Sequence, residues 1–314
     1  MNNYNSIEDA FLTELETVAT TGKLVIPRNM ATVENLGCSF RISDPRARLI
    51  LSSRRKWSIF YALGELLWHL AGSNDLEFIA YYSNKWLSSS DDGTTIQGSC
   101  YGHSLFAAEQ NNLSQWENVV RLLRVDPESR RAVVSLYSAI DLAQAGTTND
   151  VPCTCTLHFL RRENAINLIS YTRSNDIILG FCYDIFIFTM LQELLAYTLG
   201  CDVGWYQHMV GSLHLYGKHE VLADEILAEG FKTGTRLMPP LSHVDQIADV
   251  LEYEREIRVS PVIDPLMAFH VAPYWESILV ALLFYKSKKL NDIPAMHIVR
   301  GRLRGTPYYS LSHV

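Results

Sequence analysis

Residues 155–171 read CTLHFLRRENAINLISY, and this stretch sets the fold class of the chain. Its first part places Cys155, Leu157 and Phe159 in alternation with polar residues, which is the two-residue period of a strand with one buried face. The charged turn RREN separates this run from a second β-like run at 165–171. Two such runs joined by a short polar turn predict a β-hairpin.

Helical patterns lie on both sides of this hairpin. Residues 185–199 are apolar nearly all round, which is typical of a central helix buried on most faces. Apolar residues recur at helical spacing over 58–70 and again over 114–123, where Ser114 and Glu117 can form a capping box. Further patterns predict strands at 131–138 and 211–216, and helices at 218–229 and 275–285.

The order of these elements indicates the architecture. Strands and helices mix without regular β-α-β alternation, so we expect an α+β fold in which a mixed β-sheet packs helices on one face. No stretch has the length of an obvious linker. We therefore expect a single domain over residues 1–314, with its motif-bearing core at about 28–220.

Composition excludes several classes of protein. The chain has 314 residues, 48% of them hydrophobic and 19% charged, which excludes disordered, collagen-like and coiled-coil proteins. A net charge of −7 argues against nonspecific nucleic-acid binding, which needs basic surface. The N-terminus lacks the pattern of a signal peptide, and no apolar run reaches a membrane span. The six cysteines show neither zinc-site spacing nor a disulfide framework, so we expect a cytoplasmic protein without a metal.

Cys153 is the best candidate nucleophile among these cysteines. It follows Pro152, whose ring fixes the backbone where a loop enters the predicted strand. Most cysteines are small buried hydrophobes, so the alternative is a structural thiol. Cys155 lies on the same predicted strand, and spacing alone does not choose between the two.

Several charged residues admit two readings each. Arginines that could hold an anion through paired hydrogen bonds, or simply be solvated, are Arg28, Arg130, Arg131 and Arg173, the last with Ser174 beside it. Asp184 stands at the start of the central helix and is either a cap or a site residue. His214 and Tyr216 lie on one face of a predicted strand, where they are either site residues or interior polar groups with hydrogen-bond partners. Glu65 either acts in a site or pairs with a buried arginine.

Taken in order, these segments resemble the thymidylate synthase family. The matching pieces are GELLWHLAGSND at 64–75, Tyr101-Gly102, DPESRR at 126–131, Pro152-Cys153, RSND at 173–176, Leu179-Gly180 and HLY at 214–216. Several rare pieces in one order are far more specific than any single piece. The last residue, Val314, also matches, although the preceding TPYYSLSH does not resemble the usual tail.

The resemblance implies a role for each matching residue. Cys153 would add to carbon 6 of a pyrimidine nucleoside monophosphate, and carbon 5 would then take the methylene of 5,10-methylenetetrahydrofolate, the co-substrate. Glu65 and Tyr101 would manage water and proton transfer near carbon 5. The remaining roles are the 5′-phosphate for Arg28, Arg173 and Ser174, the sugar for His214 and Tyr216, and the folate for Asp176, Gly180, Trp86 and Arg55. Arg130 and Arg131 would reach the phosphate from the partner subunit of a homodimer, and a nearby arginine would lower the pKa of the thiol.

Asp184 departs from the synthases, where the matching residue is asparagine. An asparagine amide suits uracil, whereas cytosine presents an amine donor beside an unprotonated ring nitrogen. A carboxyl group suits this second pattern, because one oxygen accepts from the amine and the other, when protonated, donates to the ring nitrogen. Cytidylate hydroxymethylases of the family carry aspartate here, so Asp184 indicates cytosine.

We therefore expect a CMP or dCMP 5-hydroxymethyltransferase serving modified-base or antibiotic biosynthesis. The alternative is a thymidylate synthase that methylates dUMP reductively. A third hypothesis is an inactive nucleotide-binding or RNA-binding relative. Thr154 after the nucleophile, and FCY at 181–183, also differ from the usual synthase residues.

Overall fold

The computed structural model describes residues 1–107 and 113–312. Val314, matched above to the family, lies outside the described residues. A seven-stranded sheet runs in the order β1-β3-β7-β6-β5-β4, with β2 paired to β3. The strands are β1 (Asn2–Tyr4), β2 (Lys23–Val25), β3 (Thr32–Ile42), β4 (Val133–Ser135), β5 (Thr154–Arg162), β6 (Ala165–Asp176) and β7 (Asp202–Tyr216).

The sheet is mixed, as expected. β5 and β6 form the predicted antiparallel hairpin, whereas β6 and β7 run parallel, as do β1 and β3. The predicted strand at 131–138 is wrong in length, because only Val133–Ser135 pairs with β5. Ser138 instead caps the next helix with Asp141 in a capping box, which ends the extended run.

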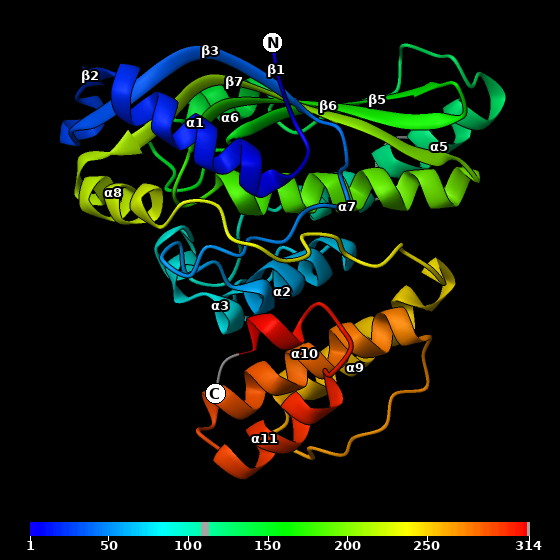
Figure 1. Ribbon diagram of the computed structural model, residues 1–314. Coiled ribbons are helices and arrows are strands. Elements are labelled where there is room, and N and C mark those ends of the chain that lie inside the picture. Colours follow the sequence, from blue (N-terminus) through cyan, green and yellow to red (C-terminus); the bar gives the residue numbers. More distant parts are fainter. Residues whose placement is uncertain (108–112, 313–314) are drawn as a thin grey trace.

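Helices cover one face of this sheet (Figure 1). The α-helices of the described residues, not all of which touch the sheet, are α1 (Ile7–Thr21), α2 (Ile59–Leu70), α3 (Leu76–Tyr82), α4 (Tyr101–Phe106), α5 (Gln115–Val125), α6 (Ala139–Gln144), α7 (Phe181–Leu199), α8 (Glu220–Glu229), α9 (Ile247–Val259), α10 (Pro273–Lys289) and α11 (Ile293–Arg302). The predicted capping box of Ser114 and Glu117 is present. The predicted central helix is α7, and it packs on β6 and β7 with most of its side chains buried.

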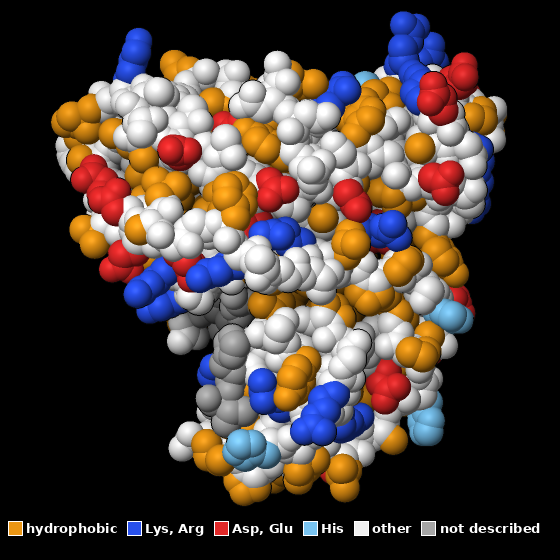
Figure 2. Space-filling view, viewed as in Figure 1, with side chains coloured by type: hydrophobic (Ala, Val, Ile, Leu, Met, Phe, Trp, Pro, Cys, Tyr) orange, Lys and Arg blue, Asp and Glu red, His pale blue; other side chains and the backbone are white. Residues whose placement is uncertain are grey.

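The C-terminal helices α9, α10 and α11 lie on the far side of α2 and α3 from the sheet (Figure 1). One hydrophobic cluster nevertheless includes residues from Ile7 to Tyr308. Figure 2 shows basic and acidic side chains interspersed over the face it draws. None of the described helices combines the length and the apolar character needed to cross a membrane. The assignment of all 314 residues to a single domain stays a prediction.

The opposite face of the sheet is more open. Tyr171 on β6 and Met209 on β7 are paired in register, and they are 42% and 38% exposed. Thr172 and Val210, their successors on the two strands, are also paired and are buried beneath the helices. The alternation therefore leaves apolar side chains on the face without helices.

Candidate active site

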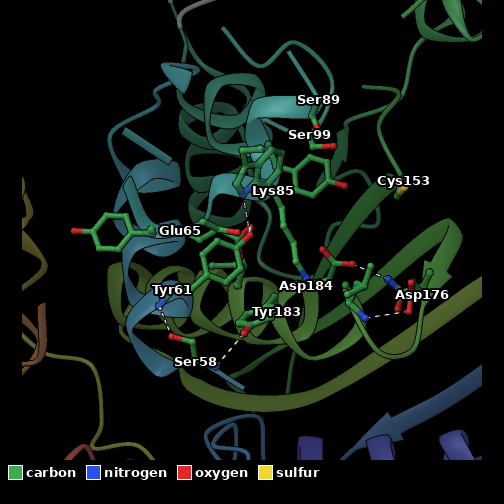
Figure 3. A pocket seen from close by; sticks show the side chains of 18 of the residues that line it. Ser58, Tyr61, Glu65, Lys85, Ser89, Ser99, Cys153, Asp176, Tyr183 and Asp184 are labelled. Atoms are coloured by element: carbon green, nitrogen blue, oxygen red, sulfur yellow. Dashed lines mark hydrogen bonds between the residues drawn. The ribbon is translucent and has the colours of Figure 1, made fainter. Parts of the chain in front are cut away.

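A cavity of about 460 Å³ opens between α2, the end of β6 and the start of α7. Figure 3 shows Glu65, Cys153, Asp176 and Asp184 around it, from four separate segments of the chain. Most of the predicted site residues line this cavity: Arg55, Glu65, Trp86, Tyr101, Cys153, Ser174, Asp176, Gly180 and Asp184. The fold thus brings together residues that are up to 129 positions apart, from Arg55 to Asp184.

Cys153 lies in the loop that enters β5, and its backbone is tied to β6. Arg173 Nε donates to the carbonyl of Pro152 at 2.9 Å, and its Nη2 donates to that of Val151 at 3.0 Å. The same Nη2 lies 3.8 Å from Cys153 Sγ. Arg173 is not among the residues that line the cavity, and its two hydrogen bonds hold the loop that carries the thiol.

Arg173 lowers the pKa of the thiol, as expected of a nearby arginine, but burial has the larger effect. Burial raises the pKa of Cys153 to about 11, and Arg173 opposes this rise only in part. The charge of Asp184 raises the pKa further. The thiol of the free protein is thus protonated at neutral pH, and nucleophilic attack requires that it lose its proton.

Glu65 projects from α2 into the cavity and is buried. Its Oε1 accepts a hydrogen bond of 2.6 Å from the Tyr61 hydroxyl, which in turn accepts one of 3.0 Å from Trp86 Nε1. Burial raises the pKa of Glu65 to about 8, so the carboxyl holds a proton at neutral pH. Tyr61, rather than a buried arginine, is therefore the partner of Glu65.

Asp184 is not a helix cap. The N-cap of α7 is Gly180, and among the described residues the hydrogen-bond partner of the Asp184 carboxyl is Asn175. Asn175 Nδ2 donates to Asp184 Oδ2 at 2.7 Å. Burial raises the pKa of Asp184 to about 7, so protonated and ionised forms both exist near neutral pH.

Three lining residues, Glu65, Asp176 and Arg55, carry buried polar atoms without a hydrogen-bond partner among the described residues, and in Glu65 the atom is Oε2. Asp176 Oδ1 accepts from the backbone amides of Ile178 and Leu179 at 2.7 and 3.0 Å, but its Oδ2 has no partner. Arg55 likewise has free Nε and Nη2 atoms. Buried polar groups without a partner are energetically costly, so these atoms are suited to a ligand. Asp176 suits a ligand that carries N–H donors, and Arg55 suits one that carries an anionic group.

Other predicted residues lie away from the cavity lining. His214 is buried on β7 with its ring edge-on to Tyr216, at a centroid separation of 5.0 Å. Arg28 is exposed in a left-handed backbone conformation (φ 49°), beside Tyr216. Arg130 and Arg131 are exposed at the turn between α5 and β4. A single chain does not bring these two arginines to the cavity lining.

The sequence reasoning missed several residues of the site. Tyr61 stands one helical turn before Glu65, a spacing that predicts contact on one helix face. Asn175 lies inside the RSND motif, but the motif alone does not show that its amide meets Asp184. Asp150 accepts hydrogen bonds from the amides of Gly98 and Ser99, each at 2.8 Å, and joins two loops that nothing in the local sequence connects. Within the described ranges, His, Cys, Asp and Glu form no cluster of three or more able to hold a metal ion.

Comparisons with known proteins give one family model and several similar proteins that share a name. The thymidylate synthase family model matches residues 9–260. A deoxyuridylate hydroxymethyltransferase of Bacillus phage SP01 is 31% identical over 211 residues, which cover 64% of this chain and 55% of that protein. Proteins of the same name from Delftia phage PhiW-14 and Pseudomonas phage M6 are 30% and 31% identical, over 72% and 62% of this chain. The matches span 66% and 56% of those two relatives, so the chain covers less than two thirds of each of the three.

Proposed function

Because the chain belongs to the thymidylate synthase family, we propose that it transfers a one-carbon unit from 5,10-methylenetetrahydrofolate to carbon 5 of a pyrimidine nucleoside monophosphate. The preferred substrate is CMP or dCMP, and the product carries a 5-hydroxymethyl group. The observation that carries the choice of base is the Asp184 carboxyl, which lines the same cavity as Cys153 and does not cap its helix.

The Cys153 thiolate starts the reaction by adding to carbon 6 of the base, which makes carbon 5 a nucleophile. Carbon 5 then forms a bond to the methylene carbon, loses its proton and releases tetrahydrofolate, which leaves an exocyclic methylene group. The oxygen of water bonds to this methylene carbon, the bond between carbon 6 and the Cys153 sulfur breaks, and the proton that water gives up is taken by the departing thiolate. Protonated Glu65 and the Tyr101 hydroxyl both line the cavity, and they transfer protons and position water at this step.

Asp184 reads the base. With its pKa near 7, the carboxyl can accept from the exocyclic amine of cytosine and, when protonated, donate to the ring nitrogen. A uracil base in the same position would leave buried groups unpaired, at a cost of about 1–3 kcal/mol per group.

The cavity also suits the folate. The free Asp176 Oδ2 would accept from the amino groups of the pterin, and Arg55 would hold an anionic group of the co-substrate. Gly180 and Trp86 complete this side of the cavity. Ser174 lines the cavity near Cys153 and would hold the phosphate, with Arg28 near the sugar residues His214 and Tyr216.

A homodimer would complete the phosphate site. Arg130 and Arg131 are exposed and do not line the cavity of their own chain, which leaves them free to serve a partner's site. The open sheet face with Tyr171 and Met209 offers an apolar surface for a second copy. The expected setting of such an enzyme is the synthesis of modified nucleosides, including antibiotics.

A second candidate is hydroxymethylation of a uracil nucleotide, which the names of the three phage relatives favour. Reductive methylation of dUMP is a third. Release of tritium from carbon 5 of CMP, dCMP, UMP and dUMP separates the bases. Release from a cytosine nucleotide supports the proposal, and release from uracil nucleotides alone rejects it.

A further inference from the structure

A buried chain of polar side chains extends from Asp184 into the core, away from the cavity. Asn175 Oδ1 lies 3.3 Å from His208 Nε2, and His208 Nδ1 lies 2.7 Å from the Tyr206 hydroxyl and 2.9 Å from Ser170 Oγ. The hydroxyls of Tyr206 and Ser170 are 2.6 Å apart. His208, Tyr206 and Ser170 are fully buried, and Asn175 is only 2% exposed.

The chemistry of these groups fixes the direction of each hydrogen bond. Asn175 Oδ1 can only accept, so the His208 Nε2 that faces it must carry a hydrogen. Burial lowers the pKa of His208 to about 3, so the ring is neutral and its Nδ1 accepts from one of the two neighbouring hydroxyls. A neutral imidazole that accepts at Nδ1 carries its hydrogen on Nε2. His208 therefore donates to Asn175 Oδ1, and the Asn175 amide must turn its NH2 group to Asp184.

This direction matters because a carboxylic acid is symmetric. Either oxygen can carry the proton, so an unconstrained aspartic acid could present a donor and an acceptor in either order. One order matches the edge of cytosine and the reverse order matches that of uracil. Because Asn175 Nδ2 donates to Oδ2, Oδ2 stays an acceptor and the proton is held on Oδ1.

We propose that His208, acting through Asn175, is a positioning residue that fixes which oxygen of Asp184 carries the proton and thereby sets the choice of base. The inference rests on the proposed role of Asp184 in reading the base. Gly180 leaves room for the arrangement, since a Cβ there would lie 3.1 Å from Asp184 Oδ2 and 3.3 Å from Asn175 Nδ2.

The test compares kcat/KM for cytosine and uracil nucleotides in variants of the chain. Asn175→Leu removes the donor to Asp184, and His208→Phe removes the group that orients Asn175. Each should change the ratio of kcat/KM for cytosine to that for uracil nucleotides by about tenfold or more, because the proton of Asp184 is then no longer held on Oδ1. His208→Gln, whose amide N–H can still donate to Asn175, should restore most of the ratio.

The two hydroxyls provide a matched control. Tyr206→Phe or Ser170→Ala alone leaves one donor for His208 Nδ1, so either change should keep the ratio. The double variant Tyr206→Phe/Ser170→Ala removes both donors and should change the cytosine-to-uracil ratio. A ratio unmoved in folded Asn175→Leu and His208→Phe proteins would overturn the proposal.

Nuclear magnetic resonance of the unaltered chain gives a test that does not depend on variants. A long-range proton–nitrogen correlation spectrum should show the hydrogen of His208 on Nε2, and a hydrogen on Nδ1 overturns the proposal. If the unaltered chain acts only on uracil nucleotides, the proposed cytosine function fails. The positioning role of His208 is judged separately: a cytosine-to-uracil ratio that changes in the variants supports it, and an unchanged ratio contradicts it.

Discussion

The Tyr61 hydroxyl donates a 2.6 Å hydrogen bond to Oε1 of Glu65, while Oε2 of the same carboxyl is buried with no hydrogen-bond partner among the described residues. The phenol stabilises the ionised carboxylate and lowers the pKa of Glu65 against the rise from burial. Tyr61→Phe should therefore raise the pKa of Glu65 further. If protonated Glu65 serves the reaction, the alkaline limb of the kcat profile should move to higher pH. An alkaline limb that moves to lower pH would contradict this role.

Stability should depend on pH through two carboxyl groups. Burial raises the pKa of Glu65 to about 8 and that of Asp184 to about 7, above their ordinary values. The folded state then binds more protons than the unfolded state, so the free energy of unfolding should fall as pH rises from about 4 to about 8. Glu65→Gln should be more stable than the unaltered chain at pH 8 by about 1–3 kcal/mol, and closely similar at pH 4. Urea denaturation at both pH values measures this, and equal stability at pH 8 would count against a buried neutral Glu65.

The reactivity of Cys153 should follow its raised pKa. With a pKa of about 11, the rate of alkylation by iodoacetamide should keep rising between pH 7 and pH 9. Arg173→Gln removes a charge that lowers the pKa of the thiol, so alkylation at pH 8 should slow. Peptide mapping distinguishes Cys153 from the other cysteines, with half-buried Cys201 as the internal reference. A rate that levels off below pH 8 would show that the thiol is already ionised.

Much of the fold is predictable from sequence, because its main elements have clear local patterns. The hairpin of β5 and β6, the buried helix α7 and the cap of α5 by Ser114 all follow from periodicity and capping chemistry. No local pattern predicts strand β3, because Glu34, Asn35 and Gly37 interrupt its alternation of apolar and polar residues. Its structure depends on pairing with β7 along nearly its whole length, which is a contact between distant segments.

The site also has a part that the sequence predicts and a part that depends on contacts between distant segments. The motifs identify Cys153, Glu65 and Asp184, but no local pattern shows which polar neighbours these side chains meet. Asn175 reaches Asp184 only because β6 leads into α7 through a tight turn, and His208 reaches Asn175 only because β7 lies parallel to β6. The effect of burial on the thiol could not be predicted either, since it depends on the assembled cavity.

Asp150 links the two loops that carry Tyr101 and Cys153. It accepts from the amides of Gly98 and Ser99 and from the Ser99 hydroxyl, at 2.6 to 2.8 Å. Asp150→Ala should lower the free energy of unfolding by about 2–3 kcal/mol, because charged hydrogen bonds to buried amides are lost. Thermal denaturation measures the change, and exposed Asp91→Ala is the matched loop control. Equal effects of the two substitutions would contradict a special role for Asp150.

Shared active sites can be tested by mixing two inactive variants. Cys153→Ala lacks the nucleophile, and the double variant Arg130→Ala/Arg131→Ala lacks the arginines assigned to the partner's site. In a mixed dimer, the intact Cys153 would meet intact arginines of the other subunit, so random mixing should restore about a quarter of full activity. No recovery from a mixture that light scattering shows to be dimeric would contradict donation across the interface.

The central claim is that Asp184 directs hydroxymethylation to a cytosine base, and mass spectrometry of the products tests it most directly. The unaltered chain is incubated with 5,10-methylenetetrahydrofolate and each of CMP, dCMP, UMP and dUMP. We expect a cytosine nucleotide to gain a hydroxymethyl group, and Asp184→Asn to shift the preference toward uracil. Modification of uracil nucleotides alone, or a gain of methyl instead of hydroxymethyl, would contradict the account.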